Sequence, residues 1–338
     1  MKTARLFGSR DIRIIETEMP SMGDDEVLLK VHVCGICGGD SRQYLSTTQI
    51  QGVAPGHEIG AEVWQVGKAV KGLNKGDAVC IEPWVFCGKC EDCLMGETNH
   101  CEYRQFMSYH LPGGLSEYIA APAHVVYKMP ALTSYETCLL VEPLSVGVHA
   151  VRRCGMKLGE TVVVFGLGSI GLSAIVAARY LGAGKIICSA KYPHQAVLAK
   201  KLGADDVVVG SQGDEVMDAI LSHTKRGADM AIMASMGVPI GLGIDALRNG
   251  GRMALYVAPQ NLEDFGKAIG KEIVMYGCDA YAAMYGKRDY EVAMEILLSG
   301  QVDFDSIVTH RFPLAQIKDA FEASTNRSSG AVKVLITF

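Results

Sequence analysis

Apolar and polar positions follow two different patterns along this chain, and the first pattern gives way to the second near Val146. Before it we expect short strands, among them residues 27–33, where three valines and a leucine alternate with Leu28, Lys30 and His32. Such alternation is typical of an antiparallel strand with one buried face. The first part of the chain is therefore predicted to be rich in antiparallel strands.

After Val146, short apolar runs alternate with helical stretches. Six strands are predicted, at Val162–Phe165, Ile186–Ser189, Val207–Val209, Met230–Ala234, Met253–Val257 and Ile273–Gly277. Strands that alternate with helices in this way predict a doubly wound parallel sheet in an α/β fold.

The last part of the chain carries a predicted helix over 288–298 and a strand-rich end over 332–338. Their simplest path returns them to the first domain. We therefore predict a first domain over 1–145, a second over 146–281, and a return to the first over 282–338.

Residues 161–178 are uncharged and long enough for a membrane span, but their glycines favour a strand, a tight turn and a helix instead.

Composition is that of an ordinary globular enzyme. The 338 residues carry a net charge of only -5, and 49% of them are hydrophobic. No basic face suggests a nucleic-acid partner, and no membrane partner is expected. The first residues lack the apolar core of a secretory signal, so the eleven cysteines are expected in the reducing cytoplasm.

Four cysteines lie close together in a polar stretch. Two, two and seven residues separate Cys87, Cys90, Cys93 and Cys101. This spacing allows four thiolates to converge on a tetrahedral ion, which is typical of structural zinc. Two disulfides or four reduced surface thiols are the alternatives.

A glycine-rich turn follows the first strand of the second domain. Gly166, Gly168 and Gly171 form G-x-G-x-x-G, with Ser169 and Ile170 opening the next helix. In this context the glycines let the backbone approach a pyrophosphate, and the helix N-terminus offers N–H groups to it. A dinucleotide site is predicted, against the alternative of a packing turn.

The residues expected to meet the ribose of that dinucleotide are Ser189, Ala190, Lys191 and Tyr192. An NAD site usually places an acid there, whereas Ser189 and Lys191 can bind a 2′-phosphate. NADP(H) is therefore favoured over NAD(H). Alternatively Lys191 is a solvated loop residue, and the missing acid only weakens discrimination.

A second metal site is suggested upstream of the four cysteines. Cys37, His57 and Glu58 offer three mixed ligands and leave an open position, as catalytic zinc requires. Glu142, expected at a helix start before Pro143, adds a carboxylate. Taken singly, each residue also has a structural interpretation, as a core cysteine, a turn histidine or a surface acid.

Together these residues resemble the zinc-dependent medium-chain alcohol dehydrogenases, most of all the sorbitol or polyol branch and its sugar-acid relatives. The resemblance covers essentially the whole chain. It is carried by the four-cysteine stretch and by residues 35–38, 56–58, 113–118, 141–150, 166–171 and 309–314.

The resemblance implies a GroES-like catalytic domain with a zinc lobe at about 85–102, a central Rossmann domain, and a homodimer or homotetramer. It also implies hydride transfer between NADP(H) or NAD(H) and a small alcohol or ketone, with zinc as a Lewis acid. Cys37, His57 and Glu58 would hold that zinc, and Glu142 would bind it directly or through water. A sugar-derived diol suits such a site better than ethanol.

Three departures from the family pattern stand out. The family's relay hydroxyl and histidine are replaced by Gly39 and Arg42, so Tyr44 or a water near Glu142 is expected to carry the proton. Arg42 is then expected to face a substrate carboxylate or phosphate, or else to pair with cofactor phosphate or a surface acid. Ala280 stands where the polyol branch often has arginine, and Ala190 is the third departure. A zinc-free reductase of enones or quinones, or a catalytically quiet binding protein, are the other functions to weigh.

Overall fold

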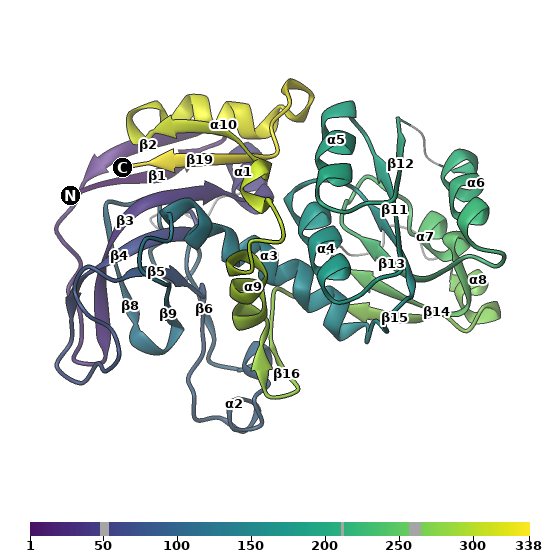
Figure 1. Ribbon diagram of the computed structural model, residues 1–338. Coiled ribbons are helices and arrows are strands. Elements are labelled where there is room, and N and C mark those ends of the chain that lie inside the picture. Colours follow the sequence, from purple (N-terminus) through teal and green to yellow (C-terminus); the bar gives the residue numbers. More distant parts are fainter. Residues whose placement is uncertain (48–53, 211–212, 257–264) are drawn as a thin grey trace. The chain divides into compact units, whose positions relative to one another are not determined.

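The computed structural model describes residues 1–47, 54–210, 213–256 and 265–338 (Figure 1). The chain divides into two compact units. The first unit combines Met1–Glu142 with Val308–Phe338, and the second unit is Pro143–Ile307. Each unit contains its own sheet and hydrophobic core.

A six-stranded parallel sheet forms the centre of the second unit, as predicted. Its strand order is β12-β11-β10-β13-β14-β15, and every neighbouring pair is parallel. The strands are β10 (Thr161–Phe165), β11 (Lys185–Ala190), β12 (Asp206–Val209), β13 (Ala228–Met233), β14 (Leu247–Leu255) and β15 (Val274–Gly277). This is the strand order of a Rossmann fold. The predicted end of the fifth strand, Val257, lies outside the described residues.

Helices connect these strands. They are α4 (Ser169–Tyr180), α5 (Pro193–Lys201), α6 (Asp214–His223), α7 (Ile240–Ala246) and α8 (Phe265–Gly270), and α9 (Asp289–Leu298) follows the last strand. The short strands β16 (Ala283–Met284) and β17 (Lys287–Arg288) and the 3-10 turn η3 (Phe304–Ile307) complete the unit. Continuous β-branched runs such as β10 are buried on both faces, which is why their sequences show no alternation.

The first unit is built on a seven-stranded sheet with the path β18-β19-β3-β4-β5-β9, and β8 also pairs with β3. All pairs are antiparallel except β18 with β19. The strands are β3 (Glu26–Ile36), β4 (Glu58–Val66), β5 (Ala78–Ile81), β8 (Tyr118–Pro122), β9 (Val126–Lys128), β18 (Val308–Pro313) and β19 (Lys333–Thr337). The predicted alternation holds in β3 from Leu29 to Val33, whereas Leu28 is buried as well.

Smaller elements surround this sheet. Two-stranded sheets are formed by β1 (Lys2–Gly8) with β2 (Asp11–Glu16), and by β6 (Trp84–Val85) with β7 (Gln105–Phe106). The helices are α1 (Gly38–Leu45), α2 (Glu91–Leu94) and α10 (Ile317–Thr325), while α3 (Tyr135–Arg153) begins in this unit and continues into the second. The 3-10 turns are η1 (Thr98–His100), η2 (Ala123–Val125), η4 (Leu314–Gln316) and η5 (Arg327–Ser329).

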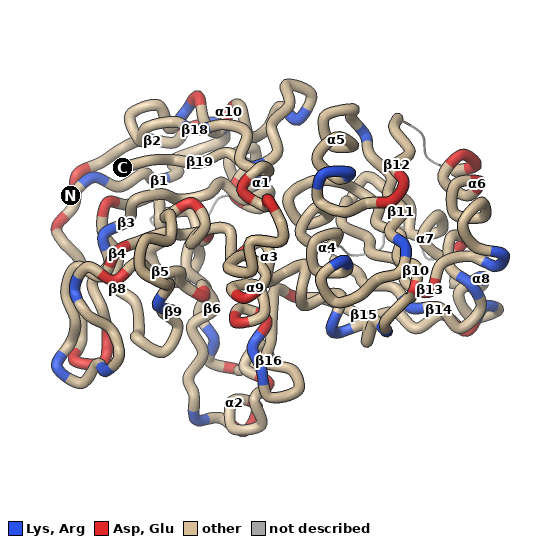
Figure 2. Tube along the Cα trace, in the orientation of Figure 1, with Lys and Arg blue, Asp and Glu red and all other residues tan. Residues whose placement is uncertain are grey.

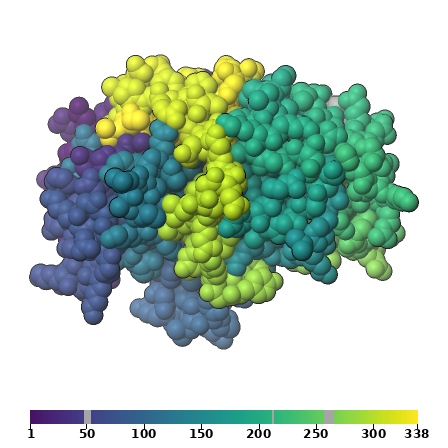
Figure 3. Space-filling model, viewed as in Figure 1, coloured from purple at the N-terminus to yellow at the C-terminus, as the bar shows by residue number. Residues whose placement is uncertain are grey.

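Both ends of the chain belong to the first unit. The C-terminal strand β19 pairs with β3, and α10 packs against α1 and β2. Figure 3 shows the yellow C-terminal segment beside the purple N-terminal one. The return to this unit begins at Val308, however, and not near residue 282.

The reason for the later return is a buried polar network at the start of α9. Asp289 accepts hydrogen bonds from His149 Nδ1 at 2.8 Å, from Arg152 at 2.5 Å and from the Ala282 N–H at 2.8 Å. These contacts tie residues 282–289 to α3, and α9 also contacts α4. Residues 282–307 therefore belong to the second unit.

Helix α3 differs from the prediction at Glu142. We expected Glu142 to start a helix, but α3 begins at Tyr135, and Pro143 lies in its interior. Proline removes one backbone hydrogen bond there. The apolar side chains around it, such as Val141 and Leu144, are fully buried, so packing offsets the missing bond.

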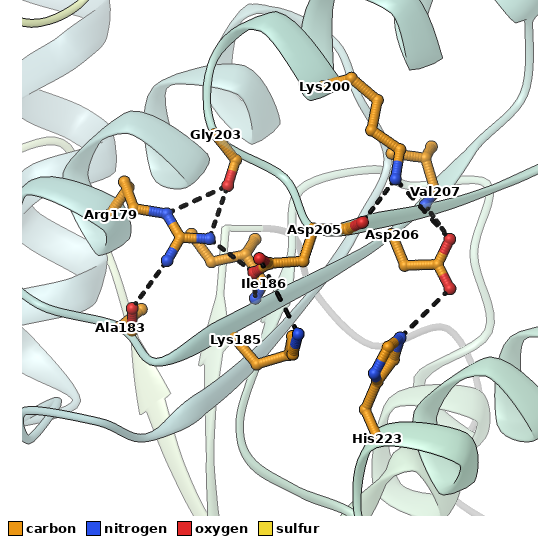
Figure 4. Close-up of polar contacts among 10 residues, drawn as sticks. All are labelled: Arg179, Ala183, Lys185, Ile186, Lys200, Gly203, Asp205, Asp206, Val207 and His223. Atoms are coloured by element: carbon orange, nitrogen blue, oxygen red, sulfur yellow. Dashed lines mark hydrogen bonds and ion pairs between the residues drawn. The ribbon is translucent and has the colours of Figure 1, made fainter.

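Charged residues are distributed over both units in short alternating stretches (Figure 2). Among the described residues, no helix is long and apolar enough to cross a membrane. One polar cluster links the starts of β11 and β12 to α4 (Figure 4). In it Asp205 accepts hydrogen bonds from Arg179 at 2.5 Å and from the Ile186 N–H at 2.7 Å. This cluster lies at the amino ends of the parallel strands, away from the edge where dinucleotides bind.

Candidate metal centres and cofactor-binding turn

Three of the predicted catalytic ligands converge. One ligand atom each from Cys37, His57 and Glu58 lie within 4.8 Å of one another. Cys37 follows β3 and caps α1, whereas His57 and Glu58 stand at the start of β4. Gly35 pairs with Glu58 across β3 and β4, and a Cβ there would lie 2.0 Å from Glu58 Oε2. The glycine thus leaves room for the carboxylate.

Asp40 orients the cluster and was not singled out from the sequence. Its Oδ2 accepts a hydrogen bond from the Cys37 N–H at 3.0 Å, while its Oδ1 lies 3.8 Å from His57 Nδ1. Burial raises the pKa of Asp40, and Oδ1 is a buried atom without a hydrogen-bond partner. An aspartate three residues after a helix N-cap is a capping signal in the sequence, and it could have identified this role.

The cluster fits a bound metal ion. His57 turns its Nδ1 side toward Asp40 and toward Ser108 Oγ, which is 3.5 Å away, so Nε2 is the nitrogen available for ligation. A metal at Nε2 would keep the proton on Nδ1, where it faces the unpartnered Asp40 oxygen. Sulfur, imidazole and carboxylate together form a donor set that zinc accepts.

Glu58 has a second partner that the sequence reading missed. Lys333 on β19 donates to both of its oxygens, with 2.6 Å between Nζ and Oε2. Both side chains are buried. The lysine compensates the charge of a carboxylate that otherwise has a metal ion as its natural partner.

Glu142 lies near this cluster but is not one of its three converging groups. Its side chain is buried, and burial raises the pKa of Glu142 to about 7, against the opposing effect of His57. Glu58 contributes to the rise by charge repulsion. The structure therefore places Glu142 within the electrostatic field of the cluster.

Tyr44 and Arg42, both on α1, have different surroundings. Tyr44 is buried, its ring packs at a tilt against Phe321 with 5.0 Å between the ring centroids, and its hydroxyl donates to Glu322 at 2.8 Å. Burial, followed by this bond, raises the pKa of Tyr44 to about 12. These contacts favour a structural role for Tyr44 over the expected proton transfer. Arg42 is exposed, and its charge acts on the phenol of Tyr109.

The four cysteines of the predicted structural site converge as well. The sulfur atoms of Cys87, Cys90, Cys93 and Cys101 lie within 4.8 Å of one another. The Cys87 N–H donates to Cys101 Sγ at 3.4 Å, and the Cys90 N–H donates to Cys87 Sγ at 3.3 Å. Backbone donors, first that of Lys89, lower the pKa of Cys87 to about 6, whereas burial and then the neighbouring Cys90 raise the pKa of Cys93 to about 12. Sulfurs that receive N–H donors are suited to the thiolate form in which cysteine binds zinc.

The glycine-rich turn has the local geometry of a phosphate-binding turn. Gly166 adopts a φ of 90°, and a Cβ on Gly171 would lie 2.0 Å from the Gly166 carbonyl oxygen. Around Gly168, in contrast, no atom lies within 4 Å of such a Cβ. Gly168 is the N-cap of α4, and within the described chain no side chain caps that helix. Ser169 and Ile170 begin α4, so its first N–H groups face this open space.

The predicted ribose-binding residues follow at the end of β11. Ser189 and Ala190 are buried, while Lys191 is exposed. Gln195 Oε1 accepts the N–H groups of Lys191 and Tyr192, each at 3.1 Å, and fixes the backbone there. The Tyr192 ring stacks on His194, whose buried Nε2 makes no hydrogen bond to the described residues.

Comparison with known proteins identifies the family. Residues 23–131 match the alcohol dehydrogenase GroES-like domain, and residues 169–299 match the zinc-binding dehydrogenase family. Sorbitol dehydrogenase of Bacillus subtilis is 34% identical over 99% of this chain and 97% of its own length. L-idonate 5-dehydrogenase of Vitis vinifera is 30% identical over 98% of this chain and 93% of its own.

Solved structures agree. An Escherichia coli oxidoreductase of unknown specificity superposes with a TM-score of 0.92 at 31% identity, covering 99% of this chain and 98% of that one. A Sinorhizobium meliloti zinc-binding dehydrogenase bound to NADP gives 0.87 at 29% identity, covering 100% and 99%. The chain therefore belongs to the zinc-dependent medium-chain alcohol dehydrogenase family. It is similar over nearly its whole length to the sorbitol and polyol dehydrogenases of that family.

Proposed function

We propose that this protein transfers a hydride between a nicotinamide cofactor and the secondary alcohol or ketone carbon of a polyol, sugar or sugar acid. One observation carries the proposal. Ligand atoms of Cys37, His57 and Glu58 converge within 4.8 Å, in a chain that also carries a glycine-rich turn at the N-terminus of α4. The relatives named for sorbitol and for L-idonate support a sugar-derived substrate.

Each residue of the cluster has a separate part in this reaction. Cys37, His57 and Glu58 would hold zinc, which when bound supplies a Lewis acid for the substrate oxygen. Asp40 orients His57, and Lys333 compensates Glu58. Glu142 would bind the ion directly or through water, since its buried carboxylate lies close enough to His57 and Glu58 to interact with their charges.

A second zinc ion is proposed at Cys87, Cys90, Cys93 and Cys101. This ion has a structural role, because four sulfur ligands leave no open position for a substrate. The short helix α2 and turn η1 bury little, so the metal would be the main constraint on this lobe.

For the cofactor we propose NADP(H) in preference to NAD(H). The support is the absence of an acid at 189–192, together with the exposed amine of Lys191 and the unpartnered Nε2 of His194. The nearby Asp205 and Asp206 lie at the start of β12, and Asp205 is bonded to Arg179. They cannot replace an acid at the end of β11.

The experiment that tests the function combines metal analysis with turnover. The purified protein should contain two zinc ions per chain and should reduce NADP+ with at least one member of a panel of polyols and sugar acids. Cys37→Ser should lose one zinc ion and the activity. Cys34→Ala is the control, since Cys34 is buried outside the cluster, and it should keep both zinc ions. Turnover that survives in zinc-depleted Cys37→Ser would contradict the proposal.

Cofactor choice has its own test. Lys191→Ala should weaken NADPH binding about tenfold in a fluorescence titration and should leave NADH binding nearly unchanged. Lys225→Ala, at another exposed lysine, should change neither. Equal losses for the two cofactors would argue against a 2′-phosphate contact.

Assembly and location complete the proposal. A homodimer or homotetramer rests on family membership alone, and sedimentation analysis tests it. A cytoplasmic location rests on the eleven cysteines, all of which are free in the structure.

A further inference from the structure

The phenol of Tyr109 lies beside the Cys37 cluster without an assigned role. A Cβ built on Gly39 would lie 3.8 Å from Cys37 Sγ and 3.9 Å from Tyr109 Oη. The tyrosine hydroxyl and the cysteine sulfur thus border the same small space above Gly39. Within the described chain, Tyr109 Oη makes no hydrogen bond. A half-buried phenol with no partner at such a place is available to a ligand.

The turn that carries Tyr109 is fixed against His57. The Tyr109 N–H donates to the Phe106 carbonyl at 3.2 Å, and the Phe106 ring lies 5.5 Å from Tyr109 and 5.0 Å from His57. Ser108 between them adopts a φ of 85°, an unusual value for a residue other than glycine. Its Oγ lies 3.5 Å from His57 Nδ1. The turn therefore presents Tyr109 in a defined position.

Other hydroxyls near the cluster are already engaged. Ser108 faces His57, and Tyr44 donates to Glu322. Gly39 has no side chain at the place where the family commonly carries a hydroxyl. A phenol ordinarily keeps its proton at neutral pH, so Tyr109 can act as a hydrogen-bond donor.

We propose that Tyr109 hydrogen-bonds the reacting oxygen of the substrate and passes on its proton, in place of the side chain that Gly39 lacks. The inference rests on the function proposed above. In the oxidation, a bound nicotinamide would supply the acceptor for the carbon-bound hydrogen and its electron pair. The hydroxyl proton of the substrate moves to the phenol oxygen, while the phenol releases its own proton to water. The products are a ketone, the reduced cofactor and one proton, and the phenol of Tyr109 is regenerated in its protonated form.

The test removes the hydroxyl at Tyr109 and then adds one at position 39. Tyr109→Phe keeps the ring and should lower kcat about 10- to 100-fold. Gly39→Ser in that background adds a hydroxyl close to the position of the lost one, with ordinary contact distances around its Cβ, and should recover at least tenfold of the loss. Tyr103→Phe, at an exposed tyrosine, is the control and should be unchanged.

A binding measurement complements the rates. Calorimetric titration of the zinc-loaded protein with its polyol should show a dissociation constant three- to tenfold higher in Tyr109→Phe. Zinc content and melting temperature should match the wild type, which separates this role from a structural one. A kcat within twofold of wild type, or a loss that Gly39→Ser does not reduce, would overturn the inference. A wild-type protein that oxidises no polyol would instead overturn the proposed function.

Discussion

Lys333 and Glu58 form a buried ion pair between the last strand of the first unit and the start of β4, with Nζ 2.6 Å from Oε2. Their relative exposures are only 1% each. An uncompensated charge at such a position is costly, so each partner depends on the other or on a metal ion.

Lys333→Met should therefore destabilise the protein, and more so without metal. We expect a loss of about 3–5 kcal/mol in the free energy of unfolding when zinc is chelated, because Glu58 then has no cation. With zinc bound the loss should be clearly smaller. Urea unfolding of wild type and variant, with zinc and with chelator, measures both values. The structural zinc site is affected equally in the two proteins and cancels in the difference.

The matched control is Lys128→Met, which removes an exposed lysine paired with Asp77. It should change stability by less than about 1 kcal/mol, with or without zinc. If Lys333→Met were equally destabilising in the two zinc states, the metal would not be sharing Glu58 with the lysine.

Gly168 and Gly171 should respond differently to the same substitution. A methyl on Gly171 would lie 2.0 Å from the Gly166 carbonyl, so Gly171→Ala should cost about 1–3 kcal/mol of stability. Gly168→Ala meets no atom within 4 Å and should fold normally. Its methyl would occupy space needed by a pyrophosphate, so cofactor binding should weaken about tenfold. Thermal unfolding and fluorescence titration separate the two effects, and normal cofactor affinity in Gly168→Ala would argue against this site.

Asp289 should be among the most sensitive polar residues of the second unit. It is fully buried and receives His149, Arg152 and the Ala282 N–H. Asp289→Asn should lower the free energy of unfolding by about 3 kcal/mol, because the partly buried guanidinium of Arg152 loses its carboxylate. Denaturant unfolding checks the value. Asp245→Asn, whose partner Lys267 is exposed, should stay within about 1 kcal/mol of wild type.

Asp205 gives a pH-dependent contribution to stability. Burial by itself raises its pKa, but hydrogen bonds from the Ile186 N–H and Arg179 outweigh it, so the pKa of Asp205 is lowered in the folded protein. A carboxyl whose pKa is lower in the folded than in the unfolded protein contributes its full stabilisation at pH values above the unfolded pKa. This contribution is lost as the pH falls through the folded pKa. At pH 7 we expect Asp205→Asn to cost about 1 kcal/mol.

This difference between wild type and Asp205→Asn should shrink as the pH falls below about 4. Urea unfolding at a series of pH values measures it. A difference that grew toward acid pH would contradict the sign of the shift.

How much of the fold and of the candidate site can be predicted from the sequence depends on how far apart the interacting residues lie along the chain. The parallel sheet is predictable because each strand is a short apolar run, such as Thr161–Phe165, between turn residues. The glycine-rich turn and the four cysteines are likewise local patterns. The start of α3 cannot be predicted from such a local pattern. Proline is typical of the first turn of a helix, but Pro143 lies inside α3, where its neighbours are buried.

In the candidate catalytic site, too, residues close together in the sequence are predictable and distant ones are not. Cys37, His57 and Glu58 lie near one another along the chain and were identified from it. Lys333 was not, because 275 residues separate it from Glu58 and no spacing rule connects them. Tyr109 was also overlooked, since only the folded turn brings it to the empty side of Gly39. Long-range pairs of this kind need the structure.

The pairing of β19 with β3 has a consequence for synthesis in the cell. A ribosome produces Glu58 275 residues before Lys333, and the whole second unit, Pro143–Ile307, is translated between them. Until then Glu58 lacks its counter-charge, and the first sheet lacks two of its strands. The nascent polypeptide therefore cannot pair Glu58 with Lys333 until the second unit has emerged, and a translation product that ends before Lys333 would keep an uncompensated carboxylate however much of the Rossmann half it had folded.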